Sequence, residues 1–365
     1  MGKKLVDDEY ISFVLTGDGS TGLFNHDVND IYHSSYGAKT EAEEKFIAPL
    51  DFYKNFKHKN SINVLDICYG IGYNTKALLK NISDVKYKGK IKIDALEYDR
   101  SLVLLSPFIK DGYQDFYPYI SLCLYKELYS QIYEERKLLS ELIFRPVNKK
   151  YFTPFYRRLI KKYRNWGYIT TLSVKINSFL HNIYYHCISL RNKCQLKYPK
   201  LCNFTFRPYF EDARKTILSL NEEYDIIFLD AFTPLKLPTL WSIDFFRELY
   251  RLSSYDGLLV TYSNSAAIRH AMLECGYYVG KIFDSSNRPS GTIASKNKNL
   301  ITHPLDDYDL GLIKTNAGVY FEDENLNNTA SEILLRHAER KKNLCLMSSS
   351  QYIKNFKKEH SDAQI

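Results

Sequence analysis

The segment of residues 224–242 constrains the fold of this chain more than any other. Its residues 226–229 (Ile-Ile-Phe-Leu) form a continuous apolar run, which is typical of a strand that is buried on both faces. The run ends in Asp230, and open α/β sheets bind their ligands at the carboxyl ends of their strands. Two prolines then predict an irregular loop that leads to Trp241. The segment predicts a polar site at the edge of a parallel sheet; the alternative is that Asp230 only caps the next helix.

A glycine turn upstream supports the interpretation as a site. Residues 62–67 predict a short strand, and residues 74–80 predict a helix that begins just after the turn. Gly70 and Gly72 lie between them, and glycine lets the backbone adopt positive φ and approach a ligand closely. The amino end of the helix would also stabilise a carboxylate of that ligand.

An acidic residue follows the next predicted strand, at residues 90–96. Glu97 lies 25 residues beyond Gly72, and an acid at that spacing can accept hydrogen bonds from both ribose hydroxyls of a nucleoside. Dinucleotide-binding enzymes share this plan, but Thr75 stands where their third glycine would fall. Asp66, four residues before the first glycine, favours S-adenosylmethionine as the nucleoside.

A further acid, Asp212, stands 18 residues ahead of Asp230 and precedes a predicted helix at residues 215–220. An aspartate after a third strand can accept a hydrogen bond from the exocyclic amine of adenine. Glu211 and Asp212 fit a pair of helix N-cap residues equally well. In series with the three acids above, the position favours a ligand contact.

Several blocks of the chain carry a family resemblance. The most specific is residues 228–234 (Phe-Leu-Asp-Ala-Phe-Thr-Pro), with Pro238 and Trp241 behind it. The other blocks are residues 16–23, residues 31–38 with Glu41 after them, the glycine turn with Tyr73 and Asn74, and residues 257–261, 291–292 and 314–320. With these blocks, about two thirds of the chain resembles the methyltransferase domain of the MnmC family, which acts in 5-methylaminomethyl-2-thiouridine synthesis in bacterial tRNA.

The resemblance implies an α/β, Rossmann-like class I S-adenosylmethionine-dependent methyltransferase. It implies conversion of 5-aminomethyl(-2-thio)uridine to 5-methylaminomethyl(-2-thio)uridine at the tRNA wobble position. Asp230 is then the expected catalytic residue. The expected cofactor-binding residues are Glu41, Asp66, Tyr69, Gly70, Gly72, Asn74, Glu97 and Asp212. The expected substrate-binding residues are Phe232, Pro234, Lys236 and Trp241, together with Arg157, Arg158, Lys161 and Lys162. Cys68 departs from the family, because it replaces the usual first glycine of the turn.

The domain organisation follows from these segments. We expect a small β/α extension at residues 1–60, with one helix at residues 38–56, and a methyltransferase core at residues 61–100 and 201–300. Residues 258–262 and 277–283 predict strands around a helix at residues 266–275, and residues 291–295 predict a last antiparallel strand. Residues 101–200 are expected to form a helical insertion, residues 301–343 a C-terminal segment, and residues 344–365 a flexible tail.

The expected insertion carries the positive charge of the chain. Residues 101–209 hold 18 Lys plus Arg against 6 Asp plus Glu, whereas the overall net charge is only +8. Arg157, Arg158, Lys161 and Lys162 alternate there with aromatic residues. Basic side chains meet phosphates and aromatic rings stack on bases, so the insertion is a candidate tRNA-binding surface. The alternative is a helical subdomain with a solvated basic face and a tyrosine-rich core.

Composition excludes several other classes. The 7 cysteines form no C-x-x-C pair, so no zinc or other metal site is expected. Neither a signal peptide nor an apolar run of about 20 residues occurs, so we expect a cytoplasmic protein without a membrane span. A G-x-G-x-x-G flavin motif is also missing, so no flavin is expected and a separate enzyme would supply the aminomethyl substrate.

The expected reaction is an in-line displacement, in which Asp230 orients the acceptor amine and takes its proton. Two other classes stay open. An aminopropyltransferase-like enzyme also places an acid in a proline-containing loop, but its polyamine channel is acidic and the insertion here is basic. A non-enzymatic RNA-binding relative would be expected to lack Asp230 or Glu97, and both are present.

Overall fold

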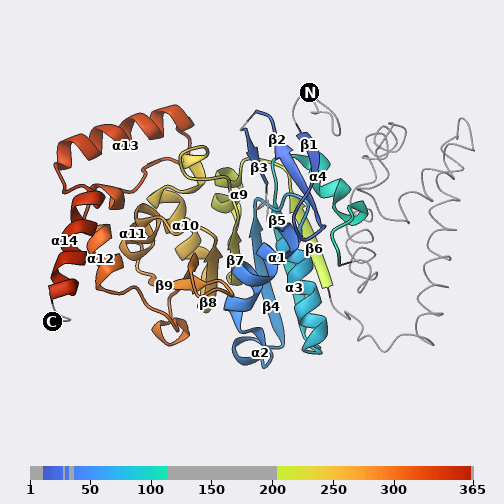
Figure 1. Cartoon of the computed structure of the whole chain (residues 1–365). Helices are drawn as coiled ribbons and strands as arrows, with labels where there is room; N and C mark the ends of the chain where they lie inside the picture. The colour runs from blue at the N-terminus through green and yellow to red at the C-terminus, as the bar shows by residue number, and fades with distance from the viewer. Residues whose placement is uncertain (1–10, 28, 33–36, 114–203, 363–365) are drawn as a thin grey trace, which may run out of the picture.

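The computed structural model describes residues 11–27, 29–32, 37–113 and 204–362. Its centre is a seven-stranded sheet in the order β6-β5-β4-β7-β8-β10-β9 (Figure 1). The strands β6, β5, β4, β7 and β8 run parallel, and β10 is antiparallel to both β8 and β9. This arrangement confirms the predicted Rossmann-like sheet with a last antiparallel strand. The strands are β4 Ser61–Ile67, β5 Lys90–Leu96, β6 Phe204–Tyr209, β7 Tyr224–Leu229, β8 Ser253–Thr261, β9 Tyr278–Phe283 and β10 Pro289–Ser295.

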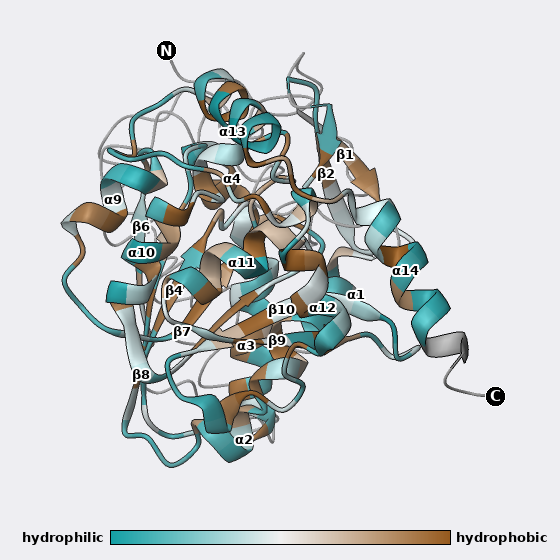
Figure 2. Cartoon of the chain, turned by 90° about the vertical axis from the view of Figure 1, so that its left-hand side faces the viewer, coloured by the Kyte–Doolittle hydropathy of each residue, from teal (hydrophilic) through white to brown (hydrophobic). Residues whose placement is uncertain are grey.

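The central strands are apolar because both faces of the sheet are covered. On β7, Ile226 and Phe228 join one buried cluster, whereas Ile227 and Leu229 join the other. This alternation follows from the period of two residues along a strand. Figure 2 shows apolar residues gathered on the central strands and polar residues on the outer helices α13 and α14.

Helices pack on both faces of the sheet (Figure 1). The core helices are α3 Tyr73–Asp84, α4 Arg100–Leu105, α9 Ala213–Ser219, α10 Ile243–Leu252 and α11 Ala266–Glu274, with the 3-10 turns η3 Ser106–Phe108 and η6 Pro238–Leu240. The C-terminal segment adds α12 Asp307–Ile313, α13 Ala330–Leu344, α14 Ser349–Asp362 and the turns η7 Lys298–Leu300 and η8 Asn316–Gly318. None of the helices in the described ranges is both long and apolar enough to cross a membrane.

The N-terminal extension pairs three strands, β1 Ile11–Leu15, β2 Thr21–Asn25 and β3 Asp30–Ile31. The helix expected at residues 38–56 is instead four short pieces: α1 Ala38–Glu41, a π-helical turn η1 Ala42–Ile47, η2 Ala48–Leu50 and α2 Phe52–Asn55. Asp51 is the break between the last two, with a left-handed φ of 39°. The Tyr73 hydroxyl donates to Thr21 O at 2.8 Å and so ties the extension to α3.

The core continues further into the expected insertion than its predicted boundary at residue 101. Phe108 and Tyr113 are buried in the core on the α3 side of the sheet. Lys76 on α3 forms a fully buried ion pair with Asp111 at 2.7 Å. Apolar residues of α4 and η3 thus pack in the core, although the sequence placed these residues in the insertion. Residues 114–203, the rest of the expected insertion, lie outside the described part of the chain.

The tail also differs from its prediction as a flexible segment. Residues 349–362 form the helix α14, which packs on α12 (Figure 1). The ring of Phe356 meets that of Tyr308 edge to face with centroids 5.1 Å apart, and Tyr352 OH donates to Asp307 O at 3.2 Å. Tyr352 and Phe356 lie on one face of α14 and pack against α12. The polar composition of the tail gave no sign of this contact.

Candidate active site

A pocket of about 540 Å³ opens at the carboxyl ends of β4, β5 and β7. The chain leaves β4 toward β5 on one side, whereas β7 is the neighbour of β4 on the other side. Ligand sites in open α/β sheets lie at such a switch point, because the loops diverge there and leave a crevice. The expected site residues that line the pocket are Glu41, Gly70, Glu97, Asp212, Asp230 and Phe232.

The glycine turn between β4 and α3 forms the floor of the pocket. Cys68, Gly70 and Gly72 all have positive φ, of 63°, 56° and 83°. A side chain on Gly70 would stand in the pocket beside Tyr32, with 3.7 Å to its ring, so glycine keeps this floor open. Cys68 adopts the positive φ that its family counterpart, a glycine, tolerates more easily, and it also lines the pocket.

Gly72 and Tyr69 pack beneath the turn. A Cβ on Gly72 would lie 2.2 Å from the Tyr69 hydroxyl oxygen, so Gly72 is needed for close packing. The Tyr69 side chain is buried and its hydroxyl lies 2.8 Å from Ser106 Oγ. Both were expected to bind the cofactor, but neither lines the pocket. The sequence could not separate them from Gly70, because only the packing of the turn decides which residue faces the ligand.

Glu97 follows β5 and faces the turn. Its Oε2 accepts from Gly70 N at 2.9 Å, and its Oε1 accepts from Asp99 N at 2.8 Å. Burial raises the pKa of Glu97 to about 7, although these backbone hydrogen bonds lower it. The carboxylate is thus held in one orientation with a lone pair on each oxygen left for a ligand hydroxyl.

Asp66 lies on β4 beneath the turn and does not line the pocket. Thr75 Oγ1 donates to Asp66 Oδ2 at 2.6 Å, and burial raises the pKa of Asp66 to about 7. Its second oxygen, Oδ1, is buried and has no hydrogen-bond partner among the described residues. A buried acceptor without a partner is costly, so this oxygen is available to a donor group or a water molecule at the turn.

Asp230 lines the pocket at the end of β7, as its sequence position predicts. Asn74 Nδ2 donates to Asp230 Oδ2 at 2.9 Å. Burial is the main reason why the pKa of Asp230 lies well above its usual range, and the nearby charge of Glu41 raises it further. Glu41 itself accepts from Lys45 Nζ at 2.6 Å. Asn74 was expected to bind the cofactor, but it contacts the predicted catalytic carboxylate.

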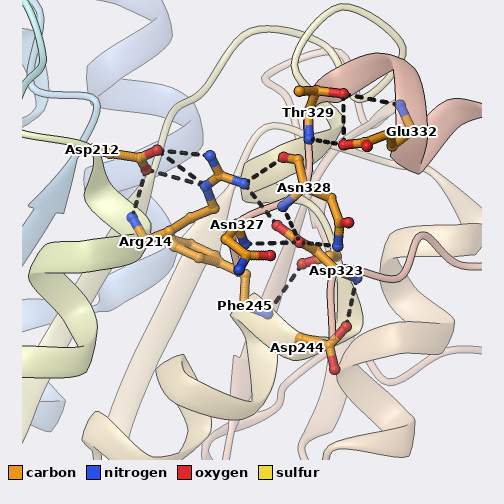
Figure 3. Close-up of polar contacts among 10 residues, drawn as sticks. Asp212, Arg214, Asp244, Phe245, Asp323, Asn327, Asn328, Thr329 and Glu332 are labelled. Atoms are coloured by element: carbon orange, nitrogen blue, oxygen red, sulfur yellow. Dashed lines mark hydrogen bonds and ion pairs between the residues drawn. The ribbon is translucent and has the colours of Figure 1, made fainter. Parts of the chain in front are cut away.

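Asp212 has the helix N-cap role, one of the two that the sequence left open. Its side chain accepts from Arg214 N at 2.9 Å and so caps α9, and it also lines the pocket. The guanidinium of Arg214 holds the same carboxylate, with Nη2 2.7 Å from Oδ2 (Figure 3). Hydrogen bonds from Arg214 lower the pKa of Asp212, although burial opposes this effect.

Arg214 connects the pocket wall to the C-terminal segment (Figure 3). Its Nη1 donates to Asp323 Oδ2 and to Asn328 O, both at 2.8 Å. Asp323 is fully buried, and its Oδ1 accepts from Asn327 N and Asn328 N at 3.1 and 3.0 Å. Thr329 and Glu332 then form a capping box at the start of α13. One arginine therefore fixes the Asp212 carboxylate, α9 and the residues before α13 relative to one another.

The loop after Asp230 is clamped from the protein interior. Trp241 is 0% exposed, and its Nε1 donates to Phe232 O at 2.7 Å. Tyr262 OH donates to Ala231 O at 2.8 Å. Trp241 was expected to bind the substrate, but it is a buried support that holds the loop by its backbone. Pro234 also lies in this loop without lining the pocket.

The N-terminal extension forms the opposite wall, from which the sequence had predicted Glu41 as the single site residue. Tyr32 meets Phe232 edge to face with ring centroids 5.0 Å apart. Lys236, expected to bind substrate, instead pairs with Asp30 Oδ2 at 3.0 Å and donates to Asn29 O at 2.9 Å. The signal that could have found this wall is the block of residues 31–38, since it resembles the family without belonging to the sheet.

The lining of the pocket is strongly acidic. Its acids are Asp27, Asp30, Glu41, Glu97, Asp99, Glu211, Asp212 and Asp230. Arg214 is the basic residue that lines it within the described part of the chain. Such a lining attracts cations, including an alkylammonium group or a sulfonium. The expected substrate-binding residues Arg157, Arg158, Lys161 and Lys162 lie outside the described residues.

The residues at the turn fit S-adenosylmethionine. Gly70 leaves an open floor at positive φ, and backbone donors orient the Glu97 carboxylate beside it. Among the described residues, no group of three or more His, Cys, Asp or Glu side chains is placed to hold a metal ion.

Comparisons with known proteins agree with this geometry. A sequence profile described as S-adenosyl-L-methionine-dependent methyltransferase matches residues 175–297. An uncharacterized protein of Methanocaldococcus jannaschii is 24% identical over 342 residues, which cover 93% of this chain and 75% of that protein. The bifunctional tRNA 5-methylaminomethyl-2-thiouridine biosynthesis protein MnmC of Burkholderia vietnamiensis is 37% identical over 71 residues, which are 20% of this chain and 11% of that protein.

The fold has a solved counterpart. The crystal structure of MnmC2 from Aquifex aeolicus superposes with a TM-score of 0.61 at 21% identity, covering 92% of this chain and 87% of that one. At 21% identity, this structural similarity supports the fold and nothing further. The matched segment spans only about a tenth of the bifunctional MnmC protein. Taken with the profile match, the chain is an S-adenosyl-L-methionine-dependent methyltransferase related to the methyltransferase part of the MnmC proteins.

Proposed function

We propose that the protein methylates the amino nitrogen of 5-aminomethyl(-2-thio)uridine at the wobble position of tRNA. The product would be 5-methylaminomethyl(-2-thio)uridine. The observation that carries this proposal is the partly buried Asp230 carboxylate, which follows β7 in an acid-lined pocket and accepts a hydrogen bond from Asn74. The name of the MnmC relatives supports the choice of acceptor, since it specifies a tRNA uridine that bears a methylaminomethyl group.

The chemistry requires a neutral amine in a fixed position. S-adenosyl-L-methionine supplies an electrophilic methyl group on its sulfonium. A primary alkylamine is mostly protonated at neutral pH and must lose that proton before its lone pair can attack. Asp230 is suited to accept it, because burial raises the pKa of this carboxyl well above its usual range and so makes it a stronger base. The acidic lining holds the incoming ammonium before the transfer.

The cofactor end of the pocket follows from the turn. Glu97 would accept from the ribose hydroxyls, and Gly70 would admit the cofactor to the floor. Asp212, held by Arg214, stands where an adenine amine would meet the wall. In this scheme the rings of Phe232 and Tyr32 form the wall at the end of the pocket that would receive the uridine. The wobble base would leave the anticodon stack to reach it.

Further partners belong to the same proposal. tRNA would be held by phosphate contacts, for which the basic residues Arg157, Arg158, Lys161 and Lys162 remain the predicted candidates. The proposal also includes a separate enzyme that would supply the aminomethyl group.

A second candidate function shares the acidic lining. A polyamine such as putrescine is a dication, so the eight acids around the pocket suit an aminopropyltransferase as well as an aminomethyluridine methyltransferase. The two differ in the group that is transferred and in the acceptor. The profile match to methyltransferases favours methyl transfer.

The decisive experiment measures transfer to defined acceptors. The protein is incubated with methyl-labelled S-adenosylmethionine and tRNA that bears 5-aminomethyl-2-thiouridine, and nucleosides are then separated. We expect label in 5-methylaminomethyl-2-thiouridine. A parallel reaction contains putrescine and decarboxylated S-adenosylmethionine. The second function would replace the first if two results occur together. The tRNA and its nucleosides would carry no label, and the parallel reaction would form spermidine.

A further inference from the structure

Asn74 occupies a rigid position next to the pocket. It is the second residue of α3, two positions after the N-cap residue Gly72, whose φ of 83° fixes the entry into the helix. Its side chain is only 4% exposed. Tyr73, the residue before it, is anchored by the hydrogen bond from its hydroxyl to Thr21 O at 2.8 Å. The backbone that carries Asn74 therefore has little freedom to move.

The first turn of α3 contacts two carboxylates, one within a strand and one just after the neighbouring strand. Asn74 Nδ2 donates to Asp230 Oδ2 at 2.9 Å, and Thr75 Oγ1 donates to Asp66 Oδ2 at 2.6 Å. Asp66 lies in β4, and Asp230 follows β7, the parallel neighbour of β4. The orientation of the Asn74 amide follows from chemistry, since the reverse would set its oxygen against a carboxylate oxygen.

We infer that Asn74 is a positioning residue: its amide donor fixes the Asp230 carboxylate that would take the proton of the acceptor amine. This inference rests on the proposed function for its catalytic meaning. An amide N–H donates and cannot accept, so the contact favours the ionised form of Asp230. A fixed carboxylate also keeps the amine lone pair in line with the methyl group.

The charges around Asp230 explain why the hydrogen bond from Asn74 matters. Glu41 and Asp66 disfavour its ionised form, whereas Lys45 and the Asn74 hydrogen bond favour it. Cys68 and Tyr262 also face this carboxylate, and its charge raises the pKa of both. Asn74 therefore supplies a direct hydrogen bond that favours the ionised carboxylate, whereas burial and the nearby acids disfavour it.

The competing role for Asn74 is direct contact with the cofactor. Its Oδ1 is buried and has no hydrogen-bond partner among the described residues, so a ligand donor could reach it. The two roles predict different results. A cofactor contact would change the affinity for S-adenosylmethionine, whereas positioning of Asp230 would change the titration of Asp230 and the turnover.

The first test needs no acceptor. Aspartate carboxyls are labelled with carbon-13, and the signal of Asp230 is identified by its loss in Asp230→Asn. Asn74→Leu, a substitution of similar volume without a donor, should raise the pKa of Asp230 by about one unit or more. Asn81→Leu is the matched control, since Asn81 lies two turns further along α3 and also has a buried Oδ1 without a described partner. An unchanged titration in Asn74→Leu would overturn the inference.

The second test is kinetic. Asn74→Leu should lower kcat by about 10- to 100-fold, the effect of losing a hydrogen bond to a charged group, with S-adenosylmethionine affinity unchanged. Asn74→Asp should retain part of its activity at low pH, where one shared proton restores the hydrogen bond, and lose it as the pH rises and the two carboxylates repel. If the leucine variant does not fold, Asn74→Ala replaces it. A loss of cofactor affinity with normal kcat would overturn the inference.

Failure of the proposed function would look different. If the wild-type protein does not methylate aminomethyluridine in tRNA, the proposed acceptor is wrong. The titration of Asp230 in Asn74→Leu would still decide whether Asn74 holds this carboxylate.

Discussion

Gly70 N donates a hydrogen bond to Glu97 Oε2 at 2.9 Å. This contact joins the glycine turn after β4 to the carboxyl end of β5, two points 27 residues apart in the chain. It orients a partly buried carboxylate toward the floor that a nucleoside would occupy. Gly70, which leaves the floor of the pocket open, therefore also orients the Glu97 carboxylate.

The first prediction concerns Glu97. Glu97→Ala removes the acceptor for the ribose hydroxyls, so the binding of S-adenosylmethionine should weaken by about 1.5–3 kcal/mol, the range for hydrogen bonds to a charged group. Isothermal titration calorimetry measures this change. The affinity of the wild-type protein should also rise from pH 6 to pH 8, since the pKa of Glu97 is raised to about 7. Glu223→Ala, an exposed acid away from the pocket, is the control. Equal affinities in both variants would remove Glu97 from the site.

The second prediction concerns Asp66 and the pH dependence of stability. Burial raises its folded-state pKa to about 7, from an ordinary value of 3.8, so the native state binds more protons than the unfolded state between these values. The contribution of Asp66 is fully present below about pH 4 and is lost as the pH rises to 7. Asp66→Asn should therefore gain stability relative to the wild type from pH 5 to pH 8, by at most about 4 kcal/mol.

Urea denaturation of both proteins at several pH values measures that gain. Asp18→Asn is a useful contrast, because hydrogen bonds lower the pKa of Asp18 to about 2 and reverse the expected slope. Parallel stability curves for the wild type and Asp66→Asn would show that Asp66 titrates normally in the folded protein.

The third prediction concerns Asp230. Asp230→Asn preserves the shape of the side chain and removes its charge, so turnover should fall by roughly 10²–10⁴, the usual effect of a general base. tRNA affinity should barely change, because phosphate contacts dominate it. The loss should be smaller at higher pH, where more of the amine is already neutral. Rates under single-turnover conditions and binding titrations provide both numbers.

Asp225→Asn is the matched control for Asp230→Asn, since Asp225 lies on the same strand at its other end and pairs with Lys59. It should leave turnover unchanged. Near-normal turnover of Asp230→Asn at neutral pH would mean that the amine loses its proton to solvent before it binds.

The fourth prediction concerns the support beneath the loop. Trp241→Phe removes the donor to Phe232 O, a bond of 2.7 Å, and should cost about 1–3 kcal/mol of stability, because a buried carbonyl loses its partner. Turnover should fall as well, since the loop carries the pocket residues Phe232 and Thr233. Tyr277→Phe removes another buried hydroxyl contact, to Ser253, away from the pocket. A similar loss of stability in both variants with equal turnover would show that the clamp does not affect the reaction.

The fifth prediction concerns the basic cluster of the sequence, which lies outside the described residues. Reversing the charge of Arg157, Arg158, Lys161 and Lys162 should weaken tRNA binding and flatten its dependence on salt concentration, because fewer counterions are released. Calorimetry of the same variant should give unchanged affinity for S-adenosylmethionine. Binding and salt dependence like those of the wild type would identify the cluster as a solvated face.

Much of the sheet was predictable, because the signals for it are local. The apolar run before Asp230 and the strands before Gly70 and Glu97 are short segments whose patterns predict buried strands, and their carboxyl ends meet at one edge in any parallel sheet. The pocket residues Gly70, Glu97 and Asp230 were found in this way. Gly276, just after α11, has a positive φ of 98°, which glycine commonly adopts at a helix C-terminus.

Tertiary structure decided which neighbours of these residues face the ligand. Tyr69 and Trp241 look like binding residues in the sequence, yet both are buried, since an aromatic ring follows the packing around it and not its place in a motif. Asn74 meets Asp230 across 156 residues, and Arg214 meets Asp323 across 109. Local patterns determine strands, turns and the edge where they meet. Hydrogen bonds between distant segments depend on the three-dimensional placement of whole elements, and only the folded chain fixes that placement.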